Sequence, residues 1–374
     1  MSIFIDLHAL HTVPPSNINR DDTGAPKTAF YGGVQRHRVS SQAWKRAIRK
    51  VFPDYLDADA LGERTRRVGE LVLKRAQAIE PNVDIAELEK SLVASFAQFK
   101  WKLEAPKTKE ETEENAYPYV RSSYLAFFST RQIEKLARAL LALEPGGKIP
   151  KKELEAILDT EQSVDIALFG RMIADAPDFN VDAAAQVAHA ISVHESTSEH
   201  DYYTAVDDVI ESSEEETGAG MIGTIEFASS TLYRYATVHL DGLAENLGDA
   251  TAAKQAAIAF AQAFITSQPT GKQNTFANQT LPELVLISVR TDRPISYVNA
   301  FEEPIVSDSG RRKAAAEKLV DEVRAVERGY GLTAKHTFVI GVGETASVAA
   351  ELGEAVPFTE IADRLGAALT AAGE

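Results

Sequence analysis

The sequence contains no cysteine, and this absence excludes several kinds of chemistry at once. Disulfide frameworks, thiolate zinc sites, iron–sulfur clusters and cysteine nucleophiles are all ruled out, and the chain suits a reducing compartment. No uncharged apolar run of about 18 residues occurs, and the first ten residues lack a basic segment followed by an apolar core. We therefore expect a cytoplasmic protein with neither a membrane span nor a signal peptide.

Basic residues are scarce beside acidic ones: the 374 residues include 39 Lys and Arg but 55 Asp and Glu, a formal net charge of −16. This balance argues against a general binder of polyanions, because Lys and Arg make most phosphate contacts. The distribution is uneven, since residues 1–50 hold eight bases and three acids, whereas no Lys or Arg lies between Met172 and Tyr233. The sequence predicts one localised anion-binding face on an acidic body.

The positively charged segment predicts a strand, a loop and a helix. Ile3 to His11 alternates apolar and polar residues, which is the period of a half-buried strand. A loop rich in Gly, Pro and Asn follows, and Ser40 or Ser41 can cap a helix from Gln42 to Val51. Apolar residues form one stripe of this helix, so two pairs of bases spaced i,i+4 point outward beside it: Lys45 with Arg49, and Arg46 with Lys50.

The rest of the chain predicts an α+β fold with one sheet and a helical insertion. The pattern from Asp54 to Gln162 is helical, with capping-box spacing at Ser129 and Gln132. Apolar runs predict strands, and Ala-rich or amphipathic runs predict helices. The expected strands are Val164–Phe169, Ile225–Leu240, Leu284–Arg290 and His336–Gly341, and the expected helices are Ala244–Ser267 and Arg311–Arg328. A length of roughly two domains fits this division.

Short motifs give little support for a nucleotide, metal or catalytic site. Gly218, Gly220 and Gly223 have the spacing of a dinucleotide fingerprint but lack the strand before it and the helix after it. His189, His194 and His200 lie near acidic residues without the spacing of a compact metal motif. No nucleophile elbow or catalytic carboxylate pair is recognisable. We therefore expect no catalytic residue, no metal and no cofactor.

The basic helix is the strongest local signal. An isolated basic helix face is usually only solvated, but further bases precede this one in a Gly-rich loop: Arg20, Lys27, Arg36 and Arg38. The backbone N–H groups at the helix start, over residues 40–42, also suit a phosphate oxygen. The sequence therefore favours phosphate binding at this helix.

Five blocks of the sequence carry a resemblance to a known family. They are SNINRDD at 16–22, FYGGVQRHRVSSQAWKRAIRK at 30–50, VDIALFGRM at 164–172, YYTAVDD at 202–208 and GTIEFASSTLYRYATVHL at 223–240. In this order they resemble the CasC-type backbone subunits of the type I-E CRISPR-associated Cascade complex. The similarity covers nearly the whole chain and is lowest in the helical region between residues 54 and 162.

The resemblance implies a fold with an RRM-like (ferredoxin-like) palm, inserted helical fingers and a thumb loop. The implied segments are palm at 1–55, fingers at 56–162, palm at 163–194, thumb at 195–222 and palm at 223–374. The family's function is not catalytic: several copies, about six, stack along the CRISPR RNA and present this guide to target DNA in antiviral defence. The implied partners are therefore CRISPR RNA, further copies of the chain, other Cascade subunits and target DNA, with no membrane.

The resemblance also implies which residues touch nucleic acid. Basic and polar side chains among the first 50 residues would hold sugar and phosphate without recognising the nucleobases. These residues are Arg20, Ser40, Gln42, Lys45, Arg46 and Arg49. Arg171 and Met172, which leave a strand at Gly170, would lie against the guide. The thumb would supply Tyr202, Tyr203, Thr204 and Val206. Of these, Tyr203 and Val206 would be wedged between nucleobases. Tyr233 and Tyr235 are expected to pack inside the palm.

A second basic group, on a turn in the expected fingers, predicts a different contact. Lys148, Lys151 and Lys152 would attract target DNA, because a filament would repeat this turn once per subunit.

Two alternatives stay open at this point. One is a ribonuclease similar to the backbone subunits of type III complexes, cutting target RNA with a thumb aspartate: Asp201, Asp207 or Asp208. The other is a metabolic α/β enzyme with an acidic active-site loop. Metal-dependent cleavage of paired RNA would identify the first, and copurification with small RNA would exclude the second.

Overall fold

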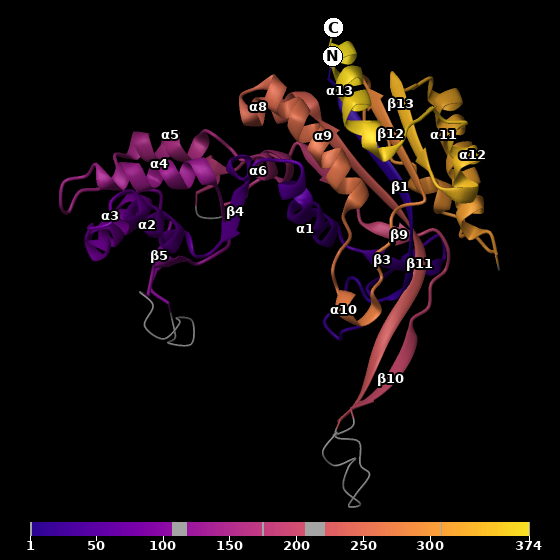
Figure 1. Ribbon diagram of the computed structural model, residues 1–374, viewed down its shortest axis with the longest axis horizontal. Coiled ribbons are helices and arrows are strands. Elements are labelled where there is room, and N and C mark those ends of the chain that lie inside the picture. Colours follow the sequence, from indigo (N-terminus) through magenta and orange to yellow (C-terminus); the bar gives the residue numbers. More distant parts are fainter. Residues whose placement is uncertain (1, 107–117, 174–175, 206–220, 308, 374) are drawn as a thin grey trace, which may run out of the picture. The chain divides into compact units, whose positions relative to one another are not determined.

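The computed structural model describes residues 2–106, 118–173, 176–205, 221–307 and 309–373 (Figure 1). The chain forms two compact units, each described here by itself. The first, the sheet unit, comprises Met1–Val51, Val187–Val238 and Ala257–Glu374, and the second, the helical unit, comprises Phe52–Gln186 and His239–Ala256. No helix among the described residues is long and apolar enough to cross a membrane.

The sheet unit is built on a mainly antiparallel sheet with the order β14-β13-β12-β1-β11-β9-β3-β2, and β10 and β8 also pair with β11 (Figure 1). Its long strands are β1 (Phe4–Ser16), β11 (Met221–His239), β12 (Leu284–Arg290) and β13 (His336–Gly341). Shorter strands are β2 (Thr28–Tyr31), β3 (Val34–Val39), β8 (Ala185–Val187), β9 (Ala190–Ser192), β10 (Glu199–Ala205) and β14 (Glu354–Ala355). The expected strands at the start of the chain and at 225–240, 284–290 and 336–341 are confirmed, as is the α+β class.

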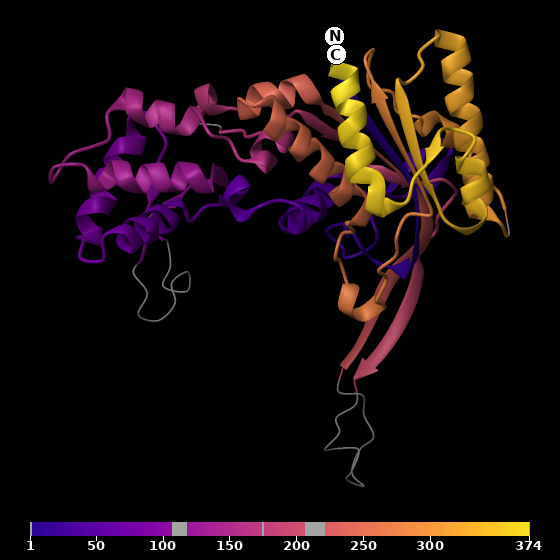
Figure 2. The same ribbon diagram turned by 45° about the horizontal axis from the view of Figure 1, so that its top comes forward.

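Helices cover both faces of β12, which explains its continuous apolar run. α11 (Arg311–Tyr330) and α13 (Ile361–Gly373) lie on opposite sides of β12 and β13 (Figure 2). All seven residues of β12 are therefore buried, and α11 packs Leu319 and Val320 against the core that contains Leu284 and Leu286. Fully covered strands lose the apolar and polar alternation of a half-exposed strand. Short elements complete this region: α10 (Gln273–Phe276), α12 (Ala346–Ala349), and 3-10 turns at Val298–Phe301, Gly343–Thr345 and Phe358–Glu360.

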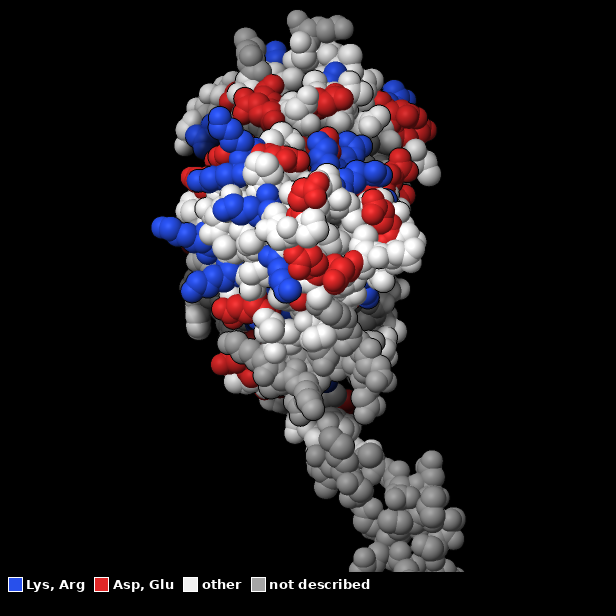
Figure 3. Space-filling view, turned by 90° about the vertical axis from the view of Figure 1, so that its left-hand side faces the viewer, with Lys and Arg blue, Asp and Glu red and all other residues white. Residues whose placement is uncertain are grey.

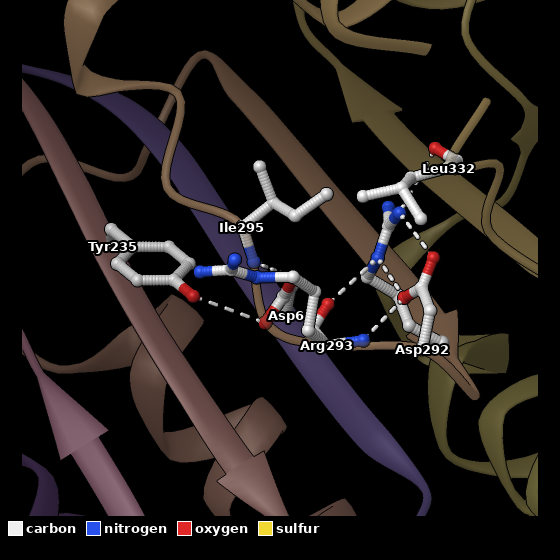
Figure 4. A network of polar contacts seen from close by, with 7 residues as sticks. Asp6, Tyr235, Asp292, Arg293, Ile295 and Leu332 are labelled. Atoms are coloured by element: carbon white, nitrogen blue, oxygen red, sulfur yellow. Dashed lines mark hydrogen bonds and ion pairs between the residues drawn. The ribbon is translucent and has the colours of Figure 1, made fainter. Parts of the chain in front are cut away.

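A buried polar network joins β1 to the loop after β12 (Figure 4). Asp6 accepts hydrogen bonds from the backbone N–H of Ile295 at 2.8 Å and from the hydroxyl of Tyr235 at 3.2 Å. Burial raises the pKa of Asp6 to about 6. The hydroxyl of Tyr233 lies 2.8 Å from Nδ1 of His8, and this tyrosine is 2% exposed. Both tyrosines are thus packed within the palm, as expected.

The helical unit contains most of the predicted insertion. Its helices are α2 (Val68–Ile79), α3 (Ile85–Ala97), α4 (Thr130–Leu141), α5 (Lys151–Asp159), α6 (Val164–Phe169) and α8 (Leu240–Leu247). Two-stranded sheets pair β4 (Gly62–Thr65) with β7 (Ala126–Ser129) and β5 (Leu103–Glu104) with β6 (Arg121–Ser122), and 3-10 turns span Phe52–Asp54, Ala58–Ala60 and Pro177–Phe179. The capping box of Ser129 and Gln132 is confirmed, and the core centres on stacked rings of Trp101 and Phe128, 5.5 Å apart.

Two sequence-based assignments are wrong. Val164–Phe169 is the helix α6 rather than a strand, and five of its six residues are buried, so its apolar run has no one-sided period. The helix expected over 244–267 is two helices, α8 and α9 (Ala250–Thr266), because Gly248 adopts a left-handed backbone with φ 70° and ends the first.

The compact units also differ from the segments that the resemblance implies. The helical unit runs on to Gln186, beyond the expected end of the fingers at residue 162, and takes in residues 239–256. At the expected thumb, β10 pairs with β11 as an antiparallel ribbon from Glu199↔Phe227 to Ala205↔Met221. Residues 206–220, which include Val206, Asp207 and Asp208, lie outside the described residues.

Candidate nucleic-acid interface

The basic helix forms as predicted and begins one residue earlier, as α1 (Ser41–Val51). Ser40 is the N-cap: its hydroxyl accepts a hydrogen bond from the backbone N–H of Ala43 at 3.3 Å. Trp44, Ala47 and Ile48 are buried, so the apolar stripe faces the core, and of the basic residues beside it Arg46 and Lys50 are exposed. No acidic residue lies in the first turn.

The helix start offers fewer free donors than expected. The N–H of Ser40 already donates to the side-chain oxygen of Asn19 at 2.8 Å. The N–H groups of Ser41 and Gln42 have no acceptor among the described residues, as is usual for the first turn of a helix. The backbone donors left without an acceptor at this end are therefore these two groups, and the N–H of Ser40 is not among them.

A groove of about 980 Å³ lies beside α1, within the sheet unit. Three segments form it: the loop Ile18–Gly24, the outward side of α1, and a turn from Gln268 to Lys272. Its charged lining residues are Arg20, Arg46, Lys50 and Lys272 against Asp21 and Asp22, and Ser40 and Gln42 also line it. Of the residues expected to hold sugar and phosphate, the structure thus brings together Arg20, Ser40, Gln42 and Arg46.

Lys45 and Arg49 do not line this groove; they form the other basic edge of α1. Both are half-buried, and burial lowers the pKa of Lys45. The two edges flank one helix, so their charges add to the same local potential. The sequence-based assignment of these two residues to RNA stays a prediction.

The acidic residues of the groove do not cancel its cations. The carboxylate of Asp21 accepts hydrogen bonds from the N–H groups of Thr23 at 2.9 Å and Ala25 at 3.0 Å, which turns it into its own loop. No ion pair joins Asp21 or Asp22 to a cation within the described part of the chain. The lining therefore keeps a positive balance of four cations to two anions.

A buried cation lies beneath α1. Arg234, on β11, is 1% exposed, and its guanidinium carbon is 3.7 Å from the centre of the Trp44 ring and 4.4 Å from that of Phe264. It donates to Nδ1 of His11 at 3.1 Å and to the carbonyl of Phe264. Burial lowers the pKa of Arg234 to about 9. Aromatic faces stabilise such a cation, and here one of the two rings belongs to Trp44, a buried residue of α1.

The β10–β11 ribbon presents aromatic side chains at the expected thumb. Tyr202 is 63% exposed and lies opposite Thr224, whereas Tyr203 lies opposite Gly223 on the other face of the ribbon. A Cβ added at Gly223 would come within 2.4 Å of the Tyr203 hydroxyl, so this ring covers the glycine. Tyr202 therefore has the more accessible ring for a base, while Thr204 and Asp201 are exposed beside it.

Arg171 lies in the helical unit and does not face outward. It is 5% exposed, and its guanidinium donates to the carbonyls of Phe179 at 2.9 Å and Leu158 at 2.8 Å. The expectation that Arg171 leaves a strand to lie against the guide is corrected. Gly170 ends the helix α6, and the guanidinium of Arg171 donates its hydrogen bonds to buried carbonyls. Met172 is 81% exposed, and its contact with a base stays a prediction.

The three lysines expected to attract DNA are all exposed around the start of α5. Lys151 is the first residue of the helix, and its ammonium lies 5.0 Å from the centre of the Phe99 ring. Figure 3 looks onto the helical unit and shows Lys and Arg interspersed with Asp and Glu. Ion pairs also occur within this unit, such as that of Arg138 with Glu134. The lysine turn is therefore a local cluster on a surface of mixed charge.

The histidines expected near acidic residues do not gather. Among the described residues no group of three His, Asp or Glu side chains could hold a metal ion. His189 instead contacts Arg38 at 3.1 Å, and His194 contacts Arg311 at 3.2 Å.

The turn from Gln268 to Lys272 is the part of the groove that the sequence did not indicate. A Cβ added at Gly271 would come within 2.5 Å of the Ile18 carbonyl oxygen, so the glycine permits close packing of the two segments. The nearest signal in the sequence is the pair Gly271 and Lys272 after the Ala-rich helix. No residue near this pair in the sequence predicts that it lies beside residue 18.

A family model described as CT1975-like protein matches residues 5–364. The chain belongs to this CT1975-like family. A search of curated proteins found no match. Among solved structures, a chain of a "CRISPR RNA-guided surveillance complex, pre-nicking" is 36% identical with a TM-score of 0.83, and the alignment covers 98% of this chain and all of that one.

A second member of such an assembly, from a "CRISPR RNA-guided surveillance complex", is 32% identical with a TM-score of 0.63, covering 98% of this chain and 99% of that one. For this CT1975-like protein the resemblance to Cascade-type subunits is thereby confirmed. Both alignments span the sheet unit and the helical unit.

Proposed function

We propose that the protein is a non-catalytic subunit of a Cascade-type surveillance complex that binds CRISPR RNA along α1 and the adjoining groove. The observation that carries the proposal is the groove itself, where cations from three separate segments converge on an otherwise acidic protein. The similarity to chains of RNA-guided surveillance complexes supports the same conclusion.

The chemistry of the groove suits a backbone rather than a base sequence. Arg and Lys contact phosphates of any nucleotide, and the free N–H groups of Ser41 and Gln42 add donors at the positive end of α1. A subunit that serves many guides needs this indifference to sequence. Stacking by Tyr202 would add affinity without base readout.

Assembly and target binding extend the proposal. About six copies would line up along one guide in the cytoplasm, joined by other Cascade subunits, with the β10–β11 ribbon reaching the neighbour's RNA. Lys148, Lys151 and Lys152, repeated in each copy, would draw target DNA to the filament. Cleavage of DNA would then belong to another protein.

The test is binding of the purified protein to fluorescent single-stranded RNAs of equal length and unrelated sequence. We expect equal affinities for all sequences, a steep loss of affinity with rising salt, and intact RNA after incubation with Mg²⁺. Different affinities would contradict backbone recognition, and RNA cleavage abolished by Asp201→Asn would favour the ribonuclease alternative.

A further inference from the structure

Lys272, on the turn opposite α1, has an unusual backbone. Its φ is 52°, in the left-handed region that glycine occupies freely and that a residue with a side chain adopts rarely. The next glycine-like conformation is at Ala277, with φ 45°, so the short helix α10 is flanked by two such residues. A lysine therefore stands where the backbone geometry favours glycine.

The surrounding contacts hold this backbone in place. Gly271 packs directly against the backbone of residues 17 and 18, with an added Cβ within 2.8 Å of the Asn17 carbonyl oxygen. On the other side, the Gln268 amide donates to the carbonyl of Asn278 at 3.1 Å and accepts from the N–H of Thr280 at 3.2 Å. The ring of Phe276 lies 5.9 Å from that of Phe227 on β11.

The Lys272 side chain has no structural partner that would explain it. It is half-buried, lines the groove, and makes no hydrogen bond or ion pair with any residue that the structure describes. The other three cations of the groove lie on α1 and the 18–24 loop. Strained backbone conformations persist where the surroundings impose them, and they concentrate at functional sites.

We propose that Lys272 is a phosphate ligand on the second wall of the groove, so that the RNA backbone is held from two sides. This inference rests on the proposed function. Arg46 and Lys50 contact the backbone from α1, and Lys272 contacts it from the turn that Gly271 fixes to residue 18. The lysine is retained in a left-handed conformation because its ammonium is needed at that point.

The test compares Lys272→Gly and Lys272→Ala with the unmodified protein and with the control Lys335→Ala, an exposed lysine of the same unit outside the groove. Affinity for a fluorescent single-stranded RNA is measured over a series of salt concentrations, together with the melting temperature. Loss of one phosphate contact should weaken binding about threefold to tenfold at low salt and reduce the slope of log affinity against log salt by about 0.7.

Lys272→Gly separates binding from stability, because glycine relieves the left-handed backbone while removing the cation. We expect its melting temperature to stay equal or rise while its affinity falls. Wild-type affinity and slope in both variants would overturn the inference while leaving the proposed function intact. A fall in melting temperature with Lys272→Gly would also overturn it, because the side chain would then serve the fold. If the unmodified protein binds no RNA, the proposed function fails as well.

Discussion

Removing the two α1 cations that line the groove, in the double variant Arg46→Ala with Lys50→Ala, should weaken RNA binding without affecting the fold. Both side chains are exposed, and the buried residues of α1 are Trp44, Ala47 and Ile48, which the substitutions leave in place. Alanine also has the highest helix propensity. We expect the melting temperature to change by no more than a degree or two.

The size of the loss follows from the charge of the two contacts. A solvent-exposed cation about 4 Å from a phosphate gains roughly 1 kcal/mol, so losing two should weaken binding about 30-fold at low salt. Each contact with single-stranded RNA contributes about 0.7 to the salt slope, so the double variant should lose about 1.4. Between about 50 and 200 mM salt, the difference from the unmodified protein should therefore shrink to about fourfold.

Fluorescence anisotropy over that salt range measures both quantities. The matched control is Arg328→Ala with Lys335→Ala, two exposed cations of the sheet unit away from the groove. In parallel, Lys45→Glu with Arg49→Glu tests the other edge of α1, where loss of RNA loading with an intact fold is expected. An unchanged affinity and slope for the Arg46 and Lys50 variant would refute the assignment of the groove.

Three further predictions concern other parts of the chain. Tyr202→Ala should weaken RNA binding by about 1–3 kcal/mol through lost stacking, with an unchanged melting temperature, whereas equal affinity would remove the ribbon from the interface. Replacing Lys148, Lys151 and Lys152 by Ala should leave RNA affinity intact and make the salt dependence of DNA binding by the assembled complex shallower; an unchanged slope would mark these lysines as merely solvated. Burial raises the pKa of Asp6 to about 6, so between about pH 4 and 6 the folded state keeps a proton that the unfolded chain has lost. The free energy of unfolding should therefore fall by roughly 3 kcal/mol as the pH rises from about 4 to 6. Denaturant titrations of Asp6→Asn should lack this part of the fall, and an identical pH profile would contradict the buried network.

Local patterns in the sequence were sufficient to predict α1, β12 and β13. The helix α1 could be predicted because its apolar stripe, its cap at Ser40 and its basic edges all lie within twelve residues. The strands β12 and β13 could be predicted to the residue from their apolar runs. In each case the signal comes from neighbours in the chain.

Elements determined by distant contacts could not be predicted in the same way. The apolar run of α6 fits a strand or a helix equally well, and only its burial among other helices selects the helix. Arg171 stands beside a family motif, yet its partners are the carbonyls of Leu158 and Phe179, which only the folded chain brings together.

The groove shows the same limit. Its α1 wall follows from the sequence, whereas the opposite wall depends on contact between Gly271 and Ile18, more than 250 residues apart. The clustered basic residues of the first 50 positions predict the basic helix. Lys272 has few basic residues near it in the sequence, so its place in the groove could not be predicted.

If copies of this chain bind side by side along an RNA backbone, the stoichiometry of the complex must depend on the length of the RNA. Native mass spectrometry of the purified protein with single-stranded RNAs of increasing length counts the copies bound to each RNA. We expect the number of copies to rise in whole steps with RNA length, whatever the RNA sequence. A single copy at every length, or no complex with RNA at all, would contradict it.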